Sequence, residues 1–163
     1  MDQSDVLEIA ARHPAVSFAH GDAVVVSGER STSLLVLVSG ELVVRTGGRE
    51  IARITQPGSV VGEIGLLLGA PASADVESIG DTVMHRIDDA TALFTEYPGL
   101  GQHLAVVLAA RLRRVTTFLT DVDQQFADRT PTLGLVPDVL SQLLSGAVRD
   151  VDTGSEREPD SPY

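Results

Sequence analysis

Residues 62–76 read Gly62-Glu63-Ile64-Gly65-Leu66-Leu67-Leu68-Gly69-Ala70-Pro71-Ala72-Ser73-Ala74-Asp75-Val76. A glycine-rich turn that leads into a short helix offers backbone N–H groups and a favourable dipole to an anion. A glutamate beside such a turn can accept a hydrogen bond from a hydroxyl group. The stretch therefore combines donors for an anion with an acceptor for a hydroxyl.

The residues around this stretch predict short β-strands. Turn residues such as Gly28-Glu29, Ser39-Gly40 and Pro57-Gly58 separate aliphatic runs, and this spacing is typical of a sandwich or barrel. The runs are Val24–Val26, Leu34–Val38, Leu42–Val44 and Ile51–Ile54, and the pairs Val76/Ile79 and Val83/Ile87 indicate two more strands. Before them, residues 4–13 predict a short helix that Ser4 caps and His13-Pro14 ends.

After residue 88 the pattern becomes helical. A short helix starts at Asp88-Asp89-Ala90, and a long helix follows from about Leu100 to Phe126. Apolar residues recur on it at heptad-like spacing: Leu104, Leu108, Leu112, Val115, Leu119, Val122 and Phe126. We therefore expect a domain over residues 1–126, a linker and short helix over 127–148, and a disordered acidic tail over 149–163.

Composition excludes several classes of protein. The 163 residues carry a net charge of -11 and contain no cysteine, so disulfides and thiolate metal sites are excluded and no basic nucleic-acid footprint is present. We expect no membrane span, because no apolar run is long enough, and a cytoplasmic location. The four histidines, His13, His20, His85 and His103, lack metal-ligand spacing, and no catalytic constellation is visible, so we expect neither a metal site nor an enzyme.

The 62–76 stretch resembles the phosphate-binding cassette of the cyclic nucleotide-binding domain family. Gly62-Glu63 matches the opening of that cassette, Ala72-Ser73-Ala74 its closing, and the turns at Gly28-Glu29 and Pro57-Gly58 fit the barrel that precedes it. The resemblance covers roughly residues 6–122. It implies a mainly β fold with flanking helices: a jelly-roll β-barrel followed by a long C-terminal helix that closes over the base and forms a dimer seam.

One residue departs from the family pattern, which has arginine where this chain has Ala72. A hydrogen bond to a charged group contributes roughly 1.5–3 kcal/mol, so we expect cyclic AMP or cyclic GMP to bind weakly. The resemblance implies that Glu63 accepts from the ribose 2′-hydroxyl; alternatively Glu63 only satisfies amides of the turn. The implied ligand-binding residues are Gly62, Glu63, Ile64, Gly65, Leu66, Ala72, Ser73 and Ala74, with Thr116 and Thr117 near the base unless they are simply exposed.

Two functions remain open from the sequence. The first is a stand-alone regulatory domain that senses cyclic AMP or a similar small anion and acts on a partner protein. The second is a degenerate, ligand-free domain that serves as a dimeric interaction module. In both we expect a homodimer through the Leu104–Phe126 helix and no DNA binding, because the residues after Phe126 are few, acidic and proline-containing. The ligand and the partner protein stay open.

Overall fold

The computed structural model describes residues 1–126, so the predicted linker, short helix and tail over 127–163 lie outside the described residues. Two compact units make up the chain, residues 1–109 and residues 110–163. The first unit holds the sheets and the shorter helices. The long helix α4 (Pro98–Phe126) begins in the first unit and continues into the second. No helix within residues 1–126 combines the length and apolarity that a bilayer crossing requires.

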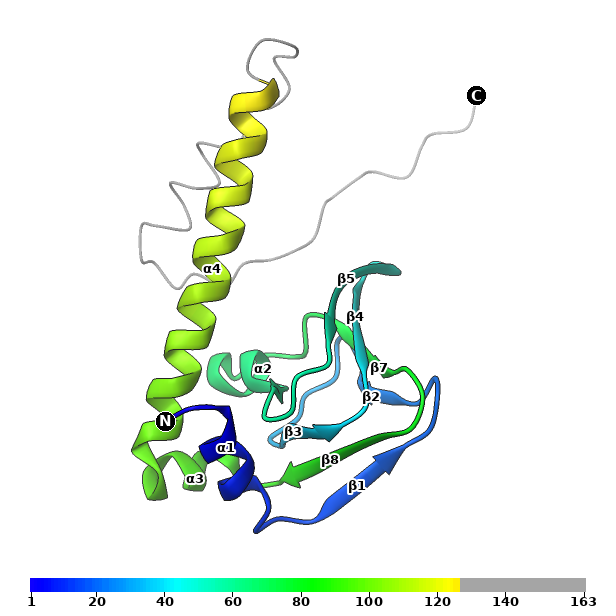
Figure 1. Cartoon of the computed structure of the whole chain (residues 1–163), viewed down its shortest axis with the longest axis vertical. Coiled ribbons are helices and arrows are strands. Elements are labelled where there is room, and N and C mark those ends of the chain that lie inside the picture. The colour runs from blue at the N-terminus through cyan, green and yellow to red at the C-terminus, as the bar shows by residue number, and fades with distance from the viewer. Residues whose placement is uncertain (127–163) are drawn as a thin grey trace. The chain divides into compact units, whose positions relative to one another are not determined.

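Two four-stranded antiparallel sheets form the barrel (Figure 1). One sheet has the order β1-β8-β3-β6 and the other β2-β7-β4-β5, so strands distant in sequence are neighbours in both. This confirms the predicted fold class, a jelly-roll-type β-barrel followed by a long helix. The strands are β1 (Ala15–Phe18), β2 (Ala23–Val25), β3 (Leu34–Ser39), β4 (Leu42–Thr46), β5 (Arg49–Ile54), β6 (Val60–Val61), β7 (Asp75–Ser78) and β8 (Thr82–Ile87).

Strand β3 is buried on both faces, which explains its continuous apolar sequence. Side chains alternate along a strand, so Leu34 and Val36 face one way while Leu35 and Leu37 face the other. The first pair belongs to a core cluster shared with the helices, and the second pair belongs to the cluster between the sheets. Strand β3 therefore separates two cores, and β6, which leads into the 62–76 stretch, pairs with it.

The core on the helical side joins α1 (Gln3–Ala10), α3 (Ala90–Glu96) and the start of α4. Figure 1 shows α1 and α3 side by side at one end of the sheets. Buried residues in this helical core include Ile9, Leu93, Leu100 and Leu104. Arg12 connects α1 with the end of α3, because its guanidinium donates to the Tyr97 hydroxyl at 2.5 Å. The first turns of α4 are therefore fixed to the barrel by apolar burial.

Several sequence expectations need local correction. Helix α1 spans Gln3–Ala10 rather than 4–13, and its cap is Asp2, not Ser4. Asp2 and Asp5 each accept a hydrogen bond from the backbone N–H of the other, which is a capping box built from two aspartates. Strands β1 and β6 were not predicted, since runs of four and two residues carry almost no periodic pattern.

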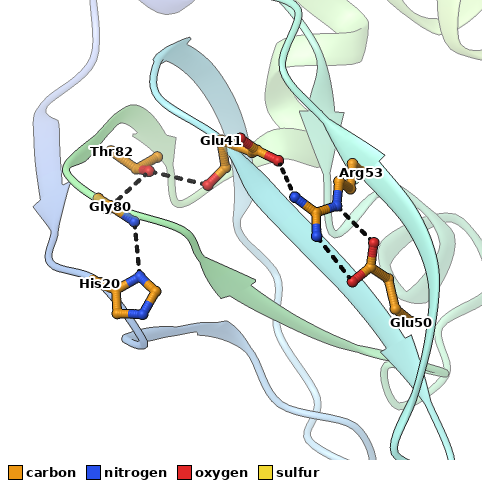
Figure 2. A network of polar contacts seen from close by, with 6 residues as sticks. All are labelled: His20, Glu41, Glu50, Arg53, Gly80 and Thr82. Atoms are coloured by element: carbon orange, nitrogen blue, oxygen red, sulfur yellow. Dashed lines mark hydrogen bonds and ion pairs between the residues drawn. The ribbon is translucent and has the colours of Figure 1, made fainter.

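A polar network ties the strands together at the barrel surface (Figure 2). Arg53 on β5 donates to Glu50 at 2.6 Å and to Glu41 at 2.8 Å. The hydrogen bond from Arg53 holds the pKa of Glu50 below its ordinary value, and both carboxylates raise the pKa of Arg53. Nearby, the Gly80 N–H donates to His20 Nδ1 at 3.1 Å. These groups satisfy one another, which gives the network a structural role.

Candidate ligand site

Residues 62–76 form a turn, the short helix α2 (Glu63–Leu68) and a return segment into β7. The chain leaves β6 at Val61 and turns at Gly62, whose φ of 91° lies in the left-handed region. A Cβ at this position would lie 3.0 Å from the Ser33 carbonyl oxygen, so a side chain would be crowded there as well as conformationally strained. The Gly62 carbonyl then accepts from Leu66 N–H at 3.2 Å, which starts the helix.

Glu63 is the first residue of α2 and is buried, with 5% of its surface exposed. It is engaged in an interaction with the surrounding protein. A carboxylate is rarely buried without such partners, because removing its charge from water is costly. The position beside the turn agrees with either interpretation of Glu63 given above, as acceptor for a ligand hydroxyl or as acceptor for the turn.

The backbone amides after Gly62 are not all equivalent. Leu66 N–H donates to the Gly62 carbonyl, so it is occupied within the helix. The first amides of any helix have no acceptor one turn earlier. Of the amides of Ile64, Gly65 and Leu66, those of Ile64 and Gly65 are therefore the ones that could face a ligand.

The return segment passes close over α2. Gly69, with φ of 61°, ends the helix, and Ala70 N–H donates back to the Gly65 carbonyl at 3.0 Å. A Cβ at Gly65 would lie 3.0 Å from the Ala70 carbonyl oxygen. The close approach explains why a small residue stands in the middle of an otherwise leucine-rich helix.

Ala72 is fixed by the loop that follows β2. Its N–H donates to the Glu29 carbonyl and its carbonyl accepts from Gly28 N–H, both at 2.8 Å. Two residues, Gly28 and Glu29, thus oppose one, which is the arrangement of a β-bulge. The half-buried Ala72 therefore has a defined place beside the 28–30 loop, although its side chain offers no charge.

Arg30, which sequence analysis did not identify, reaches this segment from the same loop. Its Nη1 donates to the Gly69 carbonyl at 2.5 Å, across 39 positions of sequence. The Gly28-Glu29 turn was visible in the sequence, but nothing in the sequence indicates that it lies against Gly69 and Ala72.

The remaining predicted residues divide between the two units. Ser73 is exposed and Ala74 is partly buried, both just before β7, so the structure brings residues 62–74 together. Thr116 and Thr117 belong to the second unit, where the Thr116 hydroxyl donates to the Leu112 carbonyl at 2.9 Å and Thr117 is exposed. Their approach to a bound base stays a prediction.

Comparison with known proteins assigns this domain to a family. The cyclic nucleotide-binding domain family matches residues 15–93, and the barrel unit of this chain belongs to it. The cAMP-dependent protein kinase regulatory subunit of Mycosarcoma maydis is 34% identical over 82 residues. That match covers 48% of this chain and 14% of the kinase subunit, so most of the relative's length has no counterpart here.

Solved structures agree in fold. The catabolite activator protein of Thermus thermophilus superposes with a TM-score of 0.64 at 26% identity, covering 76% of this chain and 61% of that one. A protein solved in work on a cyclic-GMP-dependent signalling pathway in bacterial phytopathogenesis gives a TM-score of 0.58 at 24% identity and covers 70% of this chain and 95% of that one. The family assignment favours a regulatory, ligand-binding domain over a degenerate interaction module.

Proposed function

We propose that this chain is a regulatory domain that binds a cyclic nucleotide in the Gly62–Ala74 cassette and acts through a partner protein. The observation that carries the proposal is the shape of the cassette. Two left-handed glycines bracket α2, Glu63 is buried at its start, and the return segment is hydrogen-bonded to the barrel at Ala72. Together these features hold the turn, the start of α2 and the return segment in the arrangement that an anion site at this position needs.

The groups of the cassette suit the two polar parts of a cyclic nucleotide. The amides of Ile64 and Gly65 can donate to the cyclic phosphate, and Glu63 can accept from the ribose 2′-hydroxyl. Ala72 adds no charge, which lowers the expected affinity. A hydrogen bond to a charged partner contributes roughly 1.5–3 kcal/mol, or about one to two decades in the dissociation constant.

A physical path connects the cassette with α4. Leu66 of α2 is partly buried against the helical core, and the same core contains Leu100 and Leu104 from the first turns of α4. Because packed cores respond to displacement as a unit, a ligand that shifts α2 changes the packing of α4 at its start. The long helix is then the element that reports ligand binding. A second copy of the chain packs along its apolar stripe, and the protein on which the domain acts is a separate partner.

A thermal-shift screen with cyclic AMP, cyclic GMP and cyclic dinucleotides tests the proposal. A ligand that binds only the folded chain stabilises it by about 2.7 kcal/mol at a hundred times its dissociation constant. For a domain of this size that corresponds to a rise in melting temperature of about 5–10 °C. Linear 5′-AMP serves as the control for non-specific nucleotide binding. Equal shifts with cyclic and linear nucleotides, or none with either at millimolar concentration, would contradict the proposal.

A further inference from the structure

Arg30 contacts the cassette from the loop that follows β2. The loop that carries it is fixed to the return segment by the two backbone hydrogen bonds of Gly28 and Glu29 with Ala72. The next residue, Arg30, extends its side chain to the Gly69 carbonyl at the end of α2. Its guanidinium therefore lies against the cassette at Gly69, and the loop that carries it is hydrogen-bonded to Ala72, the position at which the family has arginine.

The guanidinium of Arg30 has donors left after this contact. An arginine carries five N–H donors in one plane, and the Gly69 carbonyl takes one of them through Nη1. Nε and Nη2 can still form the paired contact with two phosphate oxygens that arginine favours. The contact with Gly69 also holds the side chain in place, which reduces the entropy that is lost when an anion binds.

Within residues 1–126, no salt bridge between Arg30 and a carboxylate is found. Three arginines of the barrel unit are in ion pairs: Arg45 with Glu77, Arg53 with Glu41 and Glu50, and Arg86 with Asp88. Among the side chains that the structure describes, Arg30 takes part in none of these salt bridges, and its only hydrogen-bond acceptor is the neutral Gly69 carbonyl. Its positive charge is therefore available to a ligand.

We propose that Arg30 supplies the positive charge for the cyclic phosphate that residue 72 does not supply. The inference rests on the proposed function and names the residue that makes a cassette with alanine at position 72 competent for an anionic ligand. It also gives the Arg30–Gly69 contact a second role besides closing α2. If the contact served only to end α2, removal of the Arg30 charge would lower the stability of the fold and would not specifically weaken binding of the phosphate.

A double-mutant cycle separates these two roles. Cyclic AMP binding is measured by calorimetry for the wild-type chain, Arg30→Gln, Ala72→Arg and the double variant. Glutamine retains an N–H donor for the Gly69 carbonyl but has no charge. Arg49→Gln is the matched control, since Arg49 lies at the start of β5, is exposed, and its loss changes the net charge equally.

The inference predicts that Arg30→Gln weakens cyclic AMP binding about ten- to hundredfold, while Arg49→Gln changes it less than about twofold. Because two cations would then serve one phosphate, Ala72→Arg should improve binding more in the Arg30→Gln background than in the wild type. Equal gains in both backgrounds would overturn the inference. So would wild-type affinity in Arg30→Gln, and so would failure of Ala72→Arg to restore its binding.

The outcomes also distinguish this inference from the proposed function. If the wild-type chain binds cyclic AMP and Arg30→Gln binds equally well, the proposed function stands and the role of Arg30 is wrong. If neither the wild type nor Ala72→Arg binds any cyclic nucleotide, both are wrong. Melting temperatures of all variants, measured without ligand, show whether the loss of binding follows from loss of stability.

Discussion

At the scale of single residues, the cassette contains three glycines that occupy their positions for different physical reasons. Gly62 and Gly69 both have positive φ, but only Gly62 is also crowded, by the Ser33 carbonyl oxygen. Gly65 has no unusual conformation, but a side chain there would be crowded by the return segment that passes over it. The sequence alone indicated that glycines are frequent in this segment. It could not indicate which of them are crowded, because the crowding atoms belong to residues outside α2 that folding brings close.

Replacing Gly62 and Gly69 by alanine in turn separates conformation from crowding. Each change places a Cβ on left-handed backbone, which costs roughly 1–2 kcal/mol. Gly62→Ala adds a contact at 3.0 Å with a backbone oxygen, whereas a Cβ at Gly69 meets no atom within 4 Å. Urea unfolding should therefore show the larger loss of stability for Gly62→Ala. Equal losses for the two variants would mean that the β6–α2 turn relaxes freely.

At the scale of elements, the long helix α4 and the longer strands were predicted from the sequence, whereas the short strands β1 and β6 were not. The six-residue β3 and the 29-residue α4 were predicted with small shifts of boundary, because β3 is a continuous apolar run and α4 carries a long apolar stripe. The two-residue β6 and the bulge between Ala72 and Gly28-Glu29 were not, because pairing partners rather than local sequence create them. The cassette was found through its family pattern, and Arg30 was missed because its contact is tertiary.

The charged pairs that connect these elements predict an acid dependence of stability. The hydrogen bond from Arg53 lowers the pKa of Glu50, and the hydrogen bond from Arg86 lowers that of Asp88. A carboxyl whose pKa is lower in the folded than in the unfolded state stabilises the fold at pH values above its ordinary pKa. The ordinary pKa is 4.5 for Glu50 and 3.8 for Asp88. That contribution is lost as the pH falls through the lower, folded values.

The melting temperature should therefore decrease as the pH is lowered below about 4.5, and Glu50→Gln should make this pH dependence weaker. The effect should be small and should shrink at high salt, because these groups are exposed. Glu8→Gln, the same change on the exposed face of α1, is the control. Melting curves between pH 3 and pH 7 at two salt concentrations measure both. A Glu50→Gln profile parallel to that of the wild type would show that this ion pair contributes nothing.

At the scale of the whole molecule, the open question is what covers the second half of α4. Leu104 is buried in the barrel unit, but the same apolar stripe continues into the second unit, where Leu112 and Val115 are about half exposed. Phe118 beside them is 64% exposed. Contiguous apolar surface of this kind marks sites of association in soluble proteins. The stripe therefore supports the proposed homodimer, with α4 of one copy packed along α4 of the other.

Val115→Glu tests this arrangement by placing a charge within the stripe. Burying two unpaired carboxylates at a helix seam opposes association, so the variant should be monomeric in sedimentation at concentrations where the wild type is dimeric. Ala110→Glu introduces the same charge on the opposite face of the helix and should leave the dimer intact. A wild-type chain that sediments as a monomer at high micromolar concentration would refute the dimer, and so would a dimeric Val115→Glu variant.

The most direct test of the account is calorimetric titration of three proteins with cyclic AMP and with cyclic GMP: the wild type, Ala72→Arg, and Ala72→Arg combined with Glu63→Gln. The account predicts that the wild type binds at least one of the two and that Ala72→Arg binds it at least about tenfold more tightly, since one charged hydrogen bond is added. Glu63→Gln should remove much of that gain by weakening the acceptor for the ribose hydroxyl. Absence of binding heat with both nucleotides, in the wild type and in Ala72→Arg alike, would contradict the claim that the Gly62–Ala74 cassette is a cyclic-nucleotide site.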